Sequence, residues 1–316
     1  MTTLNYDAEP LLHVDGLKQY FRISSTYTTK AVDGISFDIY PGETYGLVGE
    51  SGSGKSTTGR AIIRLYDPTG GKIIFDGHDI SGKMTKEDER YLRTNMQMIF
   101  QDPMACLNPR KKVKEIIAQG LEIHHLYKDQ QELEDKIYAI IDKVGLSREH
   151  ATRYPHQFSG GQRQRIGIAR ALVMNPKLVI ADEAISALDV SIQAQVDNLM
   201  KDLQDELGTT YLFIAHDLSM VKYISDRIGV MHLGHIVETG TTDEIFDNPV
   251  HPYTRSLLSA IPRPNPKVEK KRVAVEYDKD KEGVDYTKGH LHELTKTHSV
   301  LATDEDFAKW SKVHTY

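Results

Sequence analysis

The sequence predicts an α/β protein with a parallel sheet that is covered by helices. Two continuous apolar runs, "KLVIAD" at 177–182 and "TYLFIAH" at 210–216, are typical of parallel strands buried on both faces. A segment with helical periodicity, 189–208, lies between them and ends at a glycine. Strands that alternate with helices define the α/β class, in which phosphate-binding loops follow the carboxyl ends of strands.

The N-terminal third contains strand patterns and one helix. Strands are predicted at 11–16, 30–40 and 43–49, the last one apolar and ending at glycine. A helix should run from about Lys55 to Leu65 and stop at "YDPTGG". The segment "KIIFDGHDI" then predicts a pair of strands joined by an Asp-Gly turn.

The middle of the chain is helical, and its end is charged. Helical patterns cover about 111–144, and the helix in "IGIARALVM" should end at Asn175-Pro176. After about Ile261 the sequence becomes rich in proline and charge, as in "PRPNPKVEKKR" and "YDKDKEGVDYTKGH". This composition predicts a linker followed by a weakly folded extension.

Composition narrows the classes of protein. The chain has 316 residues and a formal net charge of −6, so it lacks the basic excess of a bulk nucleic-acid binder. No apolar run approaches a membrane span, and the N-terminus lacks a basic-then-apolar secretion signal. The single cysteine, Cys106, allows no internal disulfide and predicts a reducing, cytoplasmic compartment. The 14 histidines are scattered, and we predict no metal site from them.

The segment "GESGSGKST" matches the GxxxxGK[ST] phosphate loop. It follows an apolar strand and precedes a helix, a context that disfavours the alternative of a flexible Gly/Ser turn. Lys55 should reach the β- and γ-phosphates, and the Ser56 hydroxyl should hold Mg²⁺. The predicted nucleotide-binding residues here are Gly49, Glu50, Ser51, Gly52, Ser53, Gly54, Lys55, Ser56 and Thr57.

Four polar residues follow other apolar strands. Asp182 should accept a hydrogen bond from magnesium-bound water, and Glu183 should orient or deprotonate the attacking water. Gln101 could sense the magnesium and the water, and His216 could contact the γ-phosphate. Each alone could be a capping or core polar residue, but four such residues at strand ends together indicate a hydrolytic site.

A second anion site is predicted at "FSGGQ", residues 158–162. Ser159 can cap a helix whose free N–H groups and dipole favour a negative charge. The four predicted contacts are Ser159, Gly160, Gly161 and Gln162. The phosphate loop is already one anion site, so the presence of a second one in the same chain needs its own explanation.

Over about residues 9–262 the chain resembles the ATP-binding subunits of ABC transporters. The phosphate loop, Gln101, "FSGGQ", "VIADE", "SALD" and His216 occur in that family's order. The resemblance implies a P-loop NTPase core with a RecA-like mixed sheet, an antiparallel β subdomain and a helical subdomain inserted at about 102–175. It implies an ABC ATPase domain over 1–261 and an extension over 262–316.

The same resemblance explains the second anion site. In this family two ATPase domains meet head to tail, and the signature "FSGGQ" of one domain binds the ATP held by the phosphate loop of the other. Asp189, in "SALD", would then support the partner's site. The aromatic residue that stacks on adenine should be Phe21, with Tyr20 as the alternative, although either could be strand core.

Three stretches are similar to the oligopeptide and dipeptide importers: "FQDPMACLNPRKKV", "ISALDVSIQAQV" and "HPYTRSLLSAIP". The tail is similar to that of the F subunit of oligopeptide permeases. This implies an ATPase that drives oligopeptide uptake from the cytoplasmic face of the membrane, where it binds peripherally. Its partners would be a homologous D-type ATPase, two membrane permease subunits and, indirectly, an extracytoplasmic peptide-binding protein, with no nucleic acid.

The chain departs from the family pattern at two positions. Ala184 stands where a proline usually follows Asp-Glu, which frees the φ angle there but leaves the carboxylates, so activity should survive. Cys106 replaces a serine and is interpreted as a packing residue. With one cysteine, the chain cannot hold the iron–sulfur cluster of some relatives.

Other functions remain as alternatives. The substrate could be a dipeptide, nickel or glutathione, since small relatives share many motifs. A soluble ABC ATPase acting on nucleic acid or ribosomes is disfavoured, because the chain has one phosphate loop and no long coiled-coil insertion. A non-hydrolysing regulatory module is disfavoured by Glu183 and His216. The tail could contact the D-type subunit or be a solvated extension.

Overall fold

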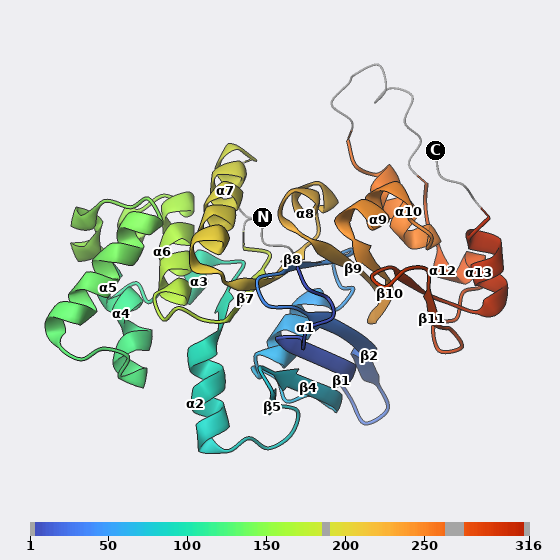
Figure 1. Ribbon diagram of the computed structural model, residues 1–316, viewed down its shortest axis with the longest axis horizontal. Coiled ribbons are helices and arrows are strands. Elements are labelled where there is room, and N and C mark those ends of the chain that lie inside the picture. The colour runs from blue at the N-terminus through green and yellow to red at the C-terminus, as the bar shows by residue number, and fades with distance from the viewer. Residues whose placement is uncertain (1–3, 185–189, 263–274, 313–316) are drawn as a thin grey trace.

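The computed structural model describes residues 4–184, 190–262 and 275–312, and its centre is a mixed sheet of eight strands (Figure 1). The strand order is β11-β12-β10-β9-β3-β8-β7-β6, and the five strands from β9 to β6 run parallel. In that order the strands are β11 (His290–Glu293), β12 (Ser299–Ala302), β10 (His235–Thr241), β9 (Arg227–His232), β3 (Thr44–Val48), β8 (Thr210–Ala215), β7 (Leu178–Asp182) and β6 (Met96–Ile99).

A second sheet of four antiparallel strands, in the order β2-β1-β4-β5, packs beside the first. Its strands are β1 (Leu12–Arg22), β2 (Thr28–Ile39), β4 (Gly70–Phe75) and β5 (His78–Asp79). The turn between β4 and β5 has positive φ at both Asp76 and Gly77, as the Asp-Gly pair predicts. The mixed sheet and the antiparallel sheet confirm the predicted fold class.

The central strands are apolar on both faces because each face packs on a different core. Val179 and Phe213 belong to the cluster on the side of the helices, whereas Ile180 and Leu212 belong to the cluster shared with the antiparallel sheet and α1 (Lys55–Ile62). Neighbouring residues of a strand point to opposite faces. The continuous apolar runs therefore identify these strands as internal, as predicted.

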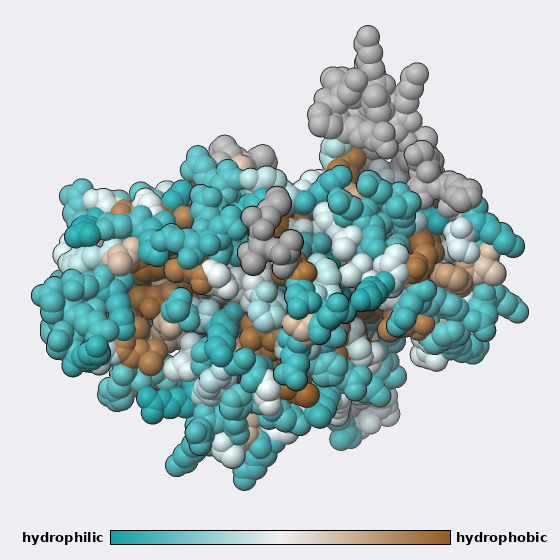
Figure 2. Space-filling view, viewed as in Figure 1, coloured by the Kyte–Doolittle hydropathy of each residue, from teal (hydrophilic) through white to brown (hydrophobic). Residues whose placement is uncertain are grey.

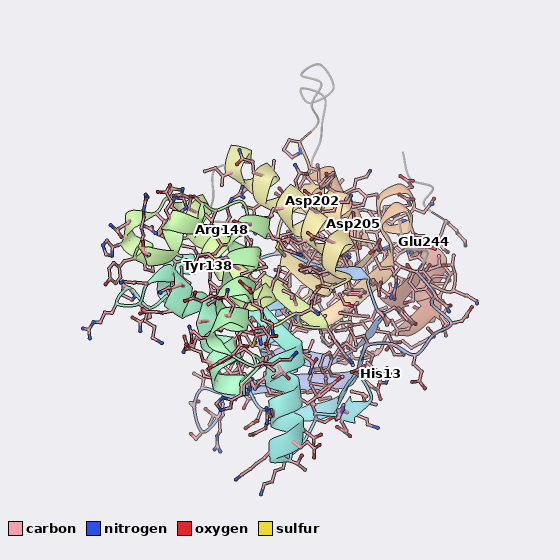
Figure 3. All side chains as sticks on the ribbon, turned by 60° about the vertical axis from the view of Figure 1, so that its left-hand side comes forward. His13, Tyr138, Arg148, Asp202, Asp205 and Glu244 are labelled. Carbon is pink, nitrogen blue, oxygen red and sulfur yellow. The ribbon has the colours of Figure 1, made fainter. Side chains whose placement is uncertain are left out.

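Helices fill the chain between β6 and β7 and form the left-hand part of Figure 1. They are α3 (Pro103–Cys106), α4 (Val113–His124), α5 (Gln130–Lys143), the 3₁₀ turns η1 (Arg148–Thr152) and η2 (Pro155–Gln157), and α6 (Gly160–Leu172). After α5, Arg148 pairs with Asp142 at 2.6 Å and lies over the ring of Tyr138 (Figure 3). This helical group runs from Pro103 to Leu172.

The other helices before the extension surround the sheets. They are α2 (Lys86–Asn95), α7 (Val190–Leu207), α8 (Leu218–Ile224), α9 (Thr242–Asp247) and α10 (Pro252–Ser259). The face seen in Figure 2 is largely hydrophilic, with small apolar areas between the elements. Within the described residues, no helix is both long enough and apolar enough to cross a membrane.

Residues 275–312 extend the main sheet. Strand β12 pairs antiparallel with β10, β11 pairs with β12, and the segment adds α12 (Lys279–Glu282) and α13 (Asp304–Trp310). Val284, Tyr286 and Trp310 are buried in the core. The prediction of a weakly folded extension is therefore wrong for 275–312. A few apolar residues of this segment pack into the core. They are far apart in the sequence, so a composition average dominated by charged residues does not reveal them.

Candidate active site

The loop between β3 and α1 can form only with glycines. Gly49, Gly52 and Gly54 all have positive φ angles. A Cβ atom on Gly49 would lie 2.0 Å from the carbonyl oxygen of Met231, and one on Gly54 would lie 2.2 Å from that of Ala31. The loop is thus pressed against β9 and β2, which fixes its backbone.

Lys55 lies inside this loop. Its Nζ donates hydrogen bonds of 2.7 Å to the carbonyl oxygens of Gly49 and Glu50 and one of 3.3 Å to Ser53 Oγ. Burial lowers the pKa of Lys55, while the nearby carboxylates of Glu183, Asp182 and Glu50 act in the opposite direction. The backbone of the loop therefore binds the ammonium group of Lys55, at the place where the sequence predicts a phosphate.

Asp182, the last residue of β7, lies next to the first turn of α1. It is 1% exposed, and its Oδ1 accepts a 2.6 Å hydrogen bond from Ser56 Oγ. Its Oδ2 lies 3.3 Å from the guanidinium of Arg60. A hydroxyl and a carboxylate oxygen side by side are the donors that Mg²⁺ prefers, so these residues fit a magnesium site.

Glu183 connects the ends of three neighbouring strands. Its Oε2 accepts a 2.8 Å hydrogen bond from Gln101 Nε2 after β6, and its Oε1 lies 3.9 Å from His216 Nδ1 after β8. Its backbone has a φ of 46°, and its N–H donates to the Ile214 carbonyl at 3.0 Å. The structure thus gathers the predicted Gln101, Glu183 and His216 at one edge of the sheet.

The signature segment lies elsewhere. Ser159 caps α6, as predicted: it accepts from the Gln162 N–H at 3.4 Å, and Gln162 Oε1 accepts from the Ser159 N–H at 3.1 Å. A Cβ atom on Gly161 would lie 2.6 Å from the Ile192 side chain, so the close approach of α6 to α7 favours glycine here. In Figure 1, α6 lies among the helices at the left and α1 lies below the sheet at the centre. In the described part of the chain, no hydrogen bond or ion pair joins Ser159–Gln162 to the phosphate loop.

The two aromatic candidates for adenine are adjacent on β1. Phe21 packs edge-on against Tyr66 with ring centroids 5.4 Å apart, and Tyr20 hydrogen-bonds Asp33 and lies under Lys30. Both are only partly buried, so neither is strand core. Asp189 and the rest of "SALD" lie outside the described residues.

Two residues near the site were not predicted. Arg60 is one helical turn after Ser56, and this i,i+4 spacing could have identified it as a neighbour of Asp182. Tyr253, in α10, accepts a 2.9 Å hydrogen bond from the N–H of Glu50. It is about 200 residues away in sequence, and no local pattern connects it to the loop. The backbone carbonyl of Cys106 accepts a 2.5 Å hydrogen bond from Arg170, which also lies beside the Cys106 thiol.

These features define an ATPase of the ABC class, and comparison with known proteins agrees. The family model described as "ABC transporter" matches residues 32–186, and "Oligopeptide/dipeptide transporter, C-terminal region" matches 237–287. The dimeric ATP-binding cassette MJ0796, in a post-hydrolysis state bound to ADP and Pi, superposes with a TM-score of 0.67. It is 26% identical and covers 73% of this chain and 98% of its own. CbiO1 of Clostridium perfringens, part of the cbiONQ transporter complex, superposes with a TM-score of 0.67. It is 27% identical, and the match covers 76% of this chain and 92% of CbiO1.

Curated relatives match almost the whole chain. The oligopeptide transport ATP-binding protein OppF of Bacillus subtilis is 56% identical over 96% of this chain and 99% of its own length. The dipeptide transport ATP-binding protein DppF of Lactococcus lactis is 52% identical over 97% of this chain and 98% of its own length. The chain therefore belongs to the ABC transporter family, as an ATP-binding subunit of the oligopeptide and dipeptide type.

Proposed function

We propose that this ATPase powers the uptake of oligopeptides across the cell membrane. The matched C-terminal region and the names of the relatives support the transport class, and the oligopeptide-transport proteins among them support the substrate. The protein would bind peripherally at the cytoplasmic face, below two membrane permease subunits. The helical segment from about Asp102 to Arg153 would contact them, and an extracytoplasmic protein would deliver the peptide.

One observation carries the proposed assembly: the signature and the phosphate loop are separated within the chain. A signature that serves a nucleotide must then serve one held by another subunit. We propose a head-to-tail heterodimer with a homologous D-type ATPase, in which Ser159–Gln162 bind the partner's ATP and Asp189 supports the partner's site. Because only the closed pair would contact ATP from both sides, ATP would stabilise that pair.

The proposed mechanism of ATP hydrolysis follows from the residues at the carboxyl ends of the parallel strands. ATP would lie on the phosphate loop, with Lys55 as a point charge for the β- and γ-phosphates and Phe21 against adenine. Glu183 would take the proton of the attacking water. Gln101 would hold the Glu183 carboxylate in place through its hydrogen bond to Oε2. The water oxygen bonds to the γ-phosphorus as the bond to the ADP oxygen breaks, giving ADP and phosphate, and His216 contacts the transferred group.

Magnesium fits the same edge of the sheet. Ser56 and Asp182 would hold it, with Gln101 nearby, and the ion would supply positive charge against the phosphate oxygens. Arg60 keeps the Asp182 carboxylate oriented through its other oxygen.

The substitution Glu183→Gln tests this mechanism in the complex purified from native cells. The amide keeps the shape of Glu183 but cannot accept the proton, so we expect ATP binding to persist and steady hydrolysis to fall about a hundredfold or more. Glu89→Gln, an exposed position on α2, is the surface control and should hydrolyse ATP normally. Rapid turnover by Glu183→Gln would remove this residue from the role of base.

A further inference from the structure

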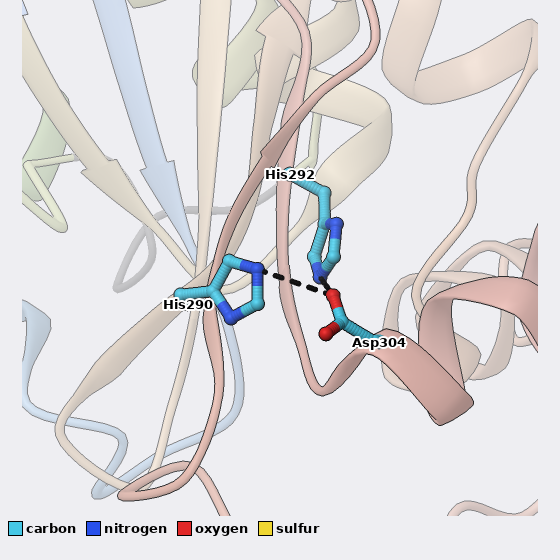
Figure 4. Close-up of side chains that lie close together, drawn as sticks. All are labelled: His290, His292 and Asp304. Carbon is cyan, nitrogen blue, oxygen red and sulfur yellow. Dashed lines mark ion pairs between the residues drawn. The ribbon is translucent and has the colours of Figure 1, made fainter.

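Two histidines and an aspartate meet in the C-terminal segment, far from the site described above. His290 and His292 lie two residues apart on β11 and point to the same side, toward Asp304 at the start of α13 (Figure 4). His290 Nε2 lies 3.4 Å and His292 Nε2 3.8 Å from the same oxygen, Asp304 Oδ1. The three ligand atoms all lie within 4.8 Å of one another.

We propose that His290, His292 and Asp304 bind a divalent transition metal, with Zn²⁺ as the representative ion. Two imidazoles and one carboxylate are a common protein donor set for such ions and leave a fourth position open. This inference is independent of the proposed transport function.

The spacing fits such an ion. Ligands about 2.1 Å from a tetrahedral metal lie about 3.4 Å from one another. The separations of 3.4 and 3.8 Å from Asp304 Oδ1 are close to this value, and the three ligand atoms lie within 4.8 Å of one another, so side-chain rotations would complete the site. The Ala302 carbonyl oxygen lies 3.2 Å from His292 Nε2 and could share the site or yield to the metal.

The site is partly organised and partly open. The His292 side chain is only 14% exposed, and its ring stacks on Phe307 with centroids 4.3 Å apart. His290 and Asp304 are well exposed, so an ion could enter from solvent. A fixed ring beside two accessible ligands reduces the conformational cost of binding.

A bound metal would link α13 to the hairpin β11–β12. At the other end of α13, Trp310 packs on His251 with ring centroids 4.8 Å apart, and its carbonyl accepts from Arg255 of α10. The ion would therefore fix a helix that already packs on α10, and would stabilise the whole C-terminal segment.

The test is calorimetric titration of the full chain with ZnCl₂, without nucleotide and with excess Mg²⁺ to occupy oxygen-only sites. A parallel titration with Co²⁺ follows the visible absorption of a nitrogen-ligated ion. The variants are His290→Gln, His292→Gln and Asp304→Asn. The matched control is His78→Gln, since His78 lies 3.1 Å from Asp88 but that pair holds only one histidine.

We expect one ion per chain, and affinity at least about tenfold weaker in each of the three variants than in the parent or the control. The parent should also unfold at a higher temperature with Zn²⁺. Equal binding by all four variants, or no binding and no Co²⁺ spectrum in the parent, would overturn the proposal. Because the Co²⁺ spectrum is read on the parent chain, a variant that fails to fold does not weaken the test.

Discussion

At the scale of single residues, the phosphate loop depends on one tyrosine from the C-terminal part of the chain. Tyr253 is 1% exposed, and its hydroxyl accepts the N–H of Glu50 inside the loop. Its ring also stacks near His232, with centroids 4.1 Å apart. Tyr253 is therefore a positioning residue: it holds the backbone that is expected to surround the phosphates.

Replacing Tyr253 with phenylalanine should weaken ATP binding by at most about fivefold. The ring would remain, but the Glu50 N–H would lose its acceptor, at a cost of about 1 kcal/mol shared between loop order and stability. Titration with a fluorescent ATP analogue measures the change. Tyr223→Phe removes a comparable 2.8 Å bond, to Asn198 on the surface, and should leave affinity unchanged. Equal affinity in both variants would show that the loop does not need Tyr253.

The sequence predicts those residues of the site that belong to a recognisable local sequence pattern. Lys55 and Ser56 follow from the phosphate-loop spacing, and Asp182 and Glu183 follow from the apolar strand before them. The left-handed φ of Glu183 and its bond to Gln101 were not predictable, because both depend on which strands are neighbours.

At the scale of elements, an aromatic cluster joins β9, α10 and the C-terminal segment. His232 Nδ1 lies 2.6 Å from the Tyr286 hydroxyl, and His251 accepts the Tyr253 N–H at 3.1 Å. Burial lowers the pKa of His232 to about 4 and that of His251 to about 3, helped by nearby positive charge. Both histidines therefore stay neutral in the folded protein at neutral pH.

This cluster should make the fold sensitive to mild acid. An unfolded histidine takes up its proton near pH 6.5, whereas these two take it up near pH 3 to 4, so the unfolded state binds more protons between those values. Their contribution to the free energy of unfolding is complete above pH 6.5 and is lost as the pH falls toward 4. Denaturant unfolding between pH 7.5 and 5.5 measures the slope.

The variant His232→Gln should reduce that slope by about one proton per chain at pH 5.5. His78→Gln, at a half-buried histidine outside the aromatic cluster, is the control and should keep the parent slope. An unchanged slope in His232→Gln would contradict the low pKa of this residue.

The elements of the core were largely predictable, and those of the extension were not. The runs at 177–182 and 210–216 show their burial directly, because each strand has apolar residues on both faces. The strand β12 has only four residues, and it exists because β10 offers an edge. Its pairing is a tertiary effect that a window of composition cannot detect.

At the scale of the whole molecule, the fold divides the nucleotide machinery into two parts. The parallel strands β3, β8, β7 and β6 carry the phosphate loop, His216, Asp182–Glu183 and Gln101 at one edge. The signature sits on the helical group instead. The motifs in the sequence predict both parts, and their separation in the fold is what motivates the proposed head-to-tail pair.

The most direct test of the proposed importer is affinity purification of tagged Glu183→Gln protein from its native cells, in the presence of ATP. The substitution should hold the ATP-bound assembly closed, and mass spectrometry then identifies its subunits. We predict recovery of one homologous ATPase and two membrane proteins. Recovery of ribosomes or DNA-repair proteins, or of no membrane subunit, would contradict the transport function and leave only the ATPase.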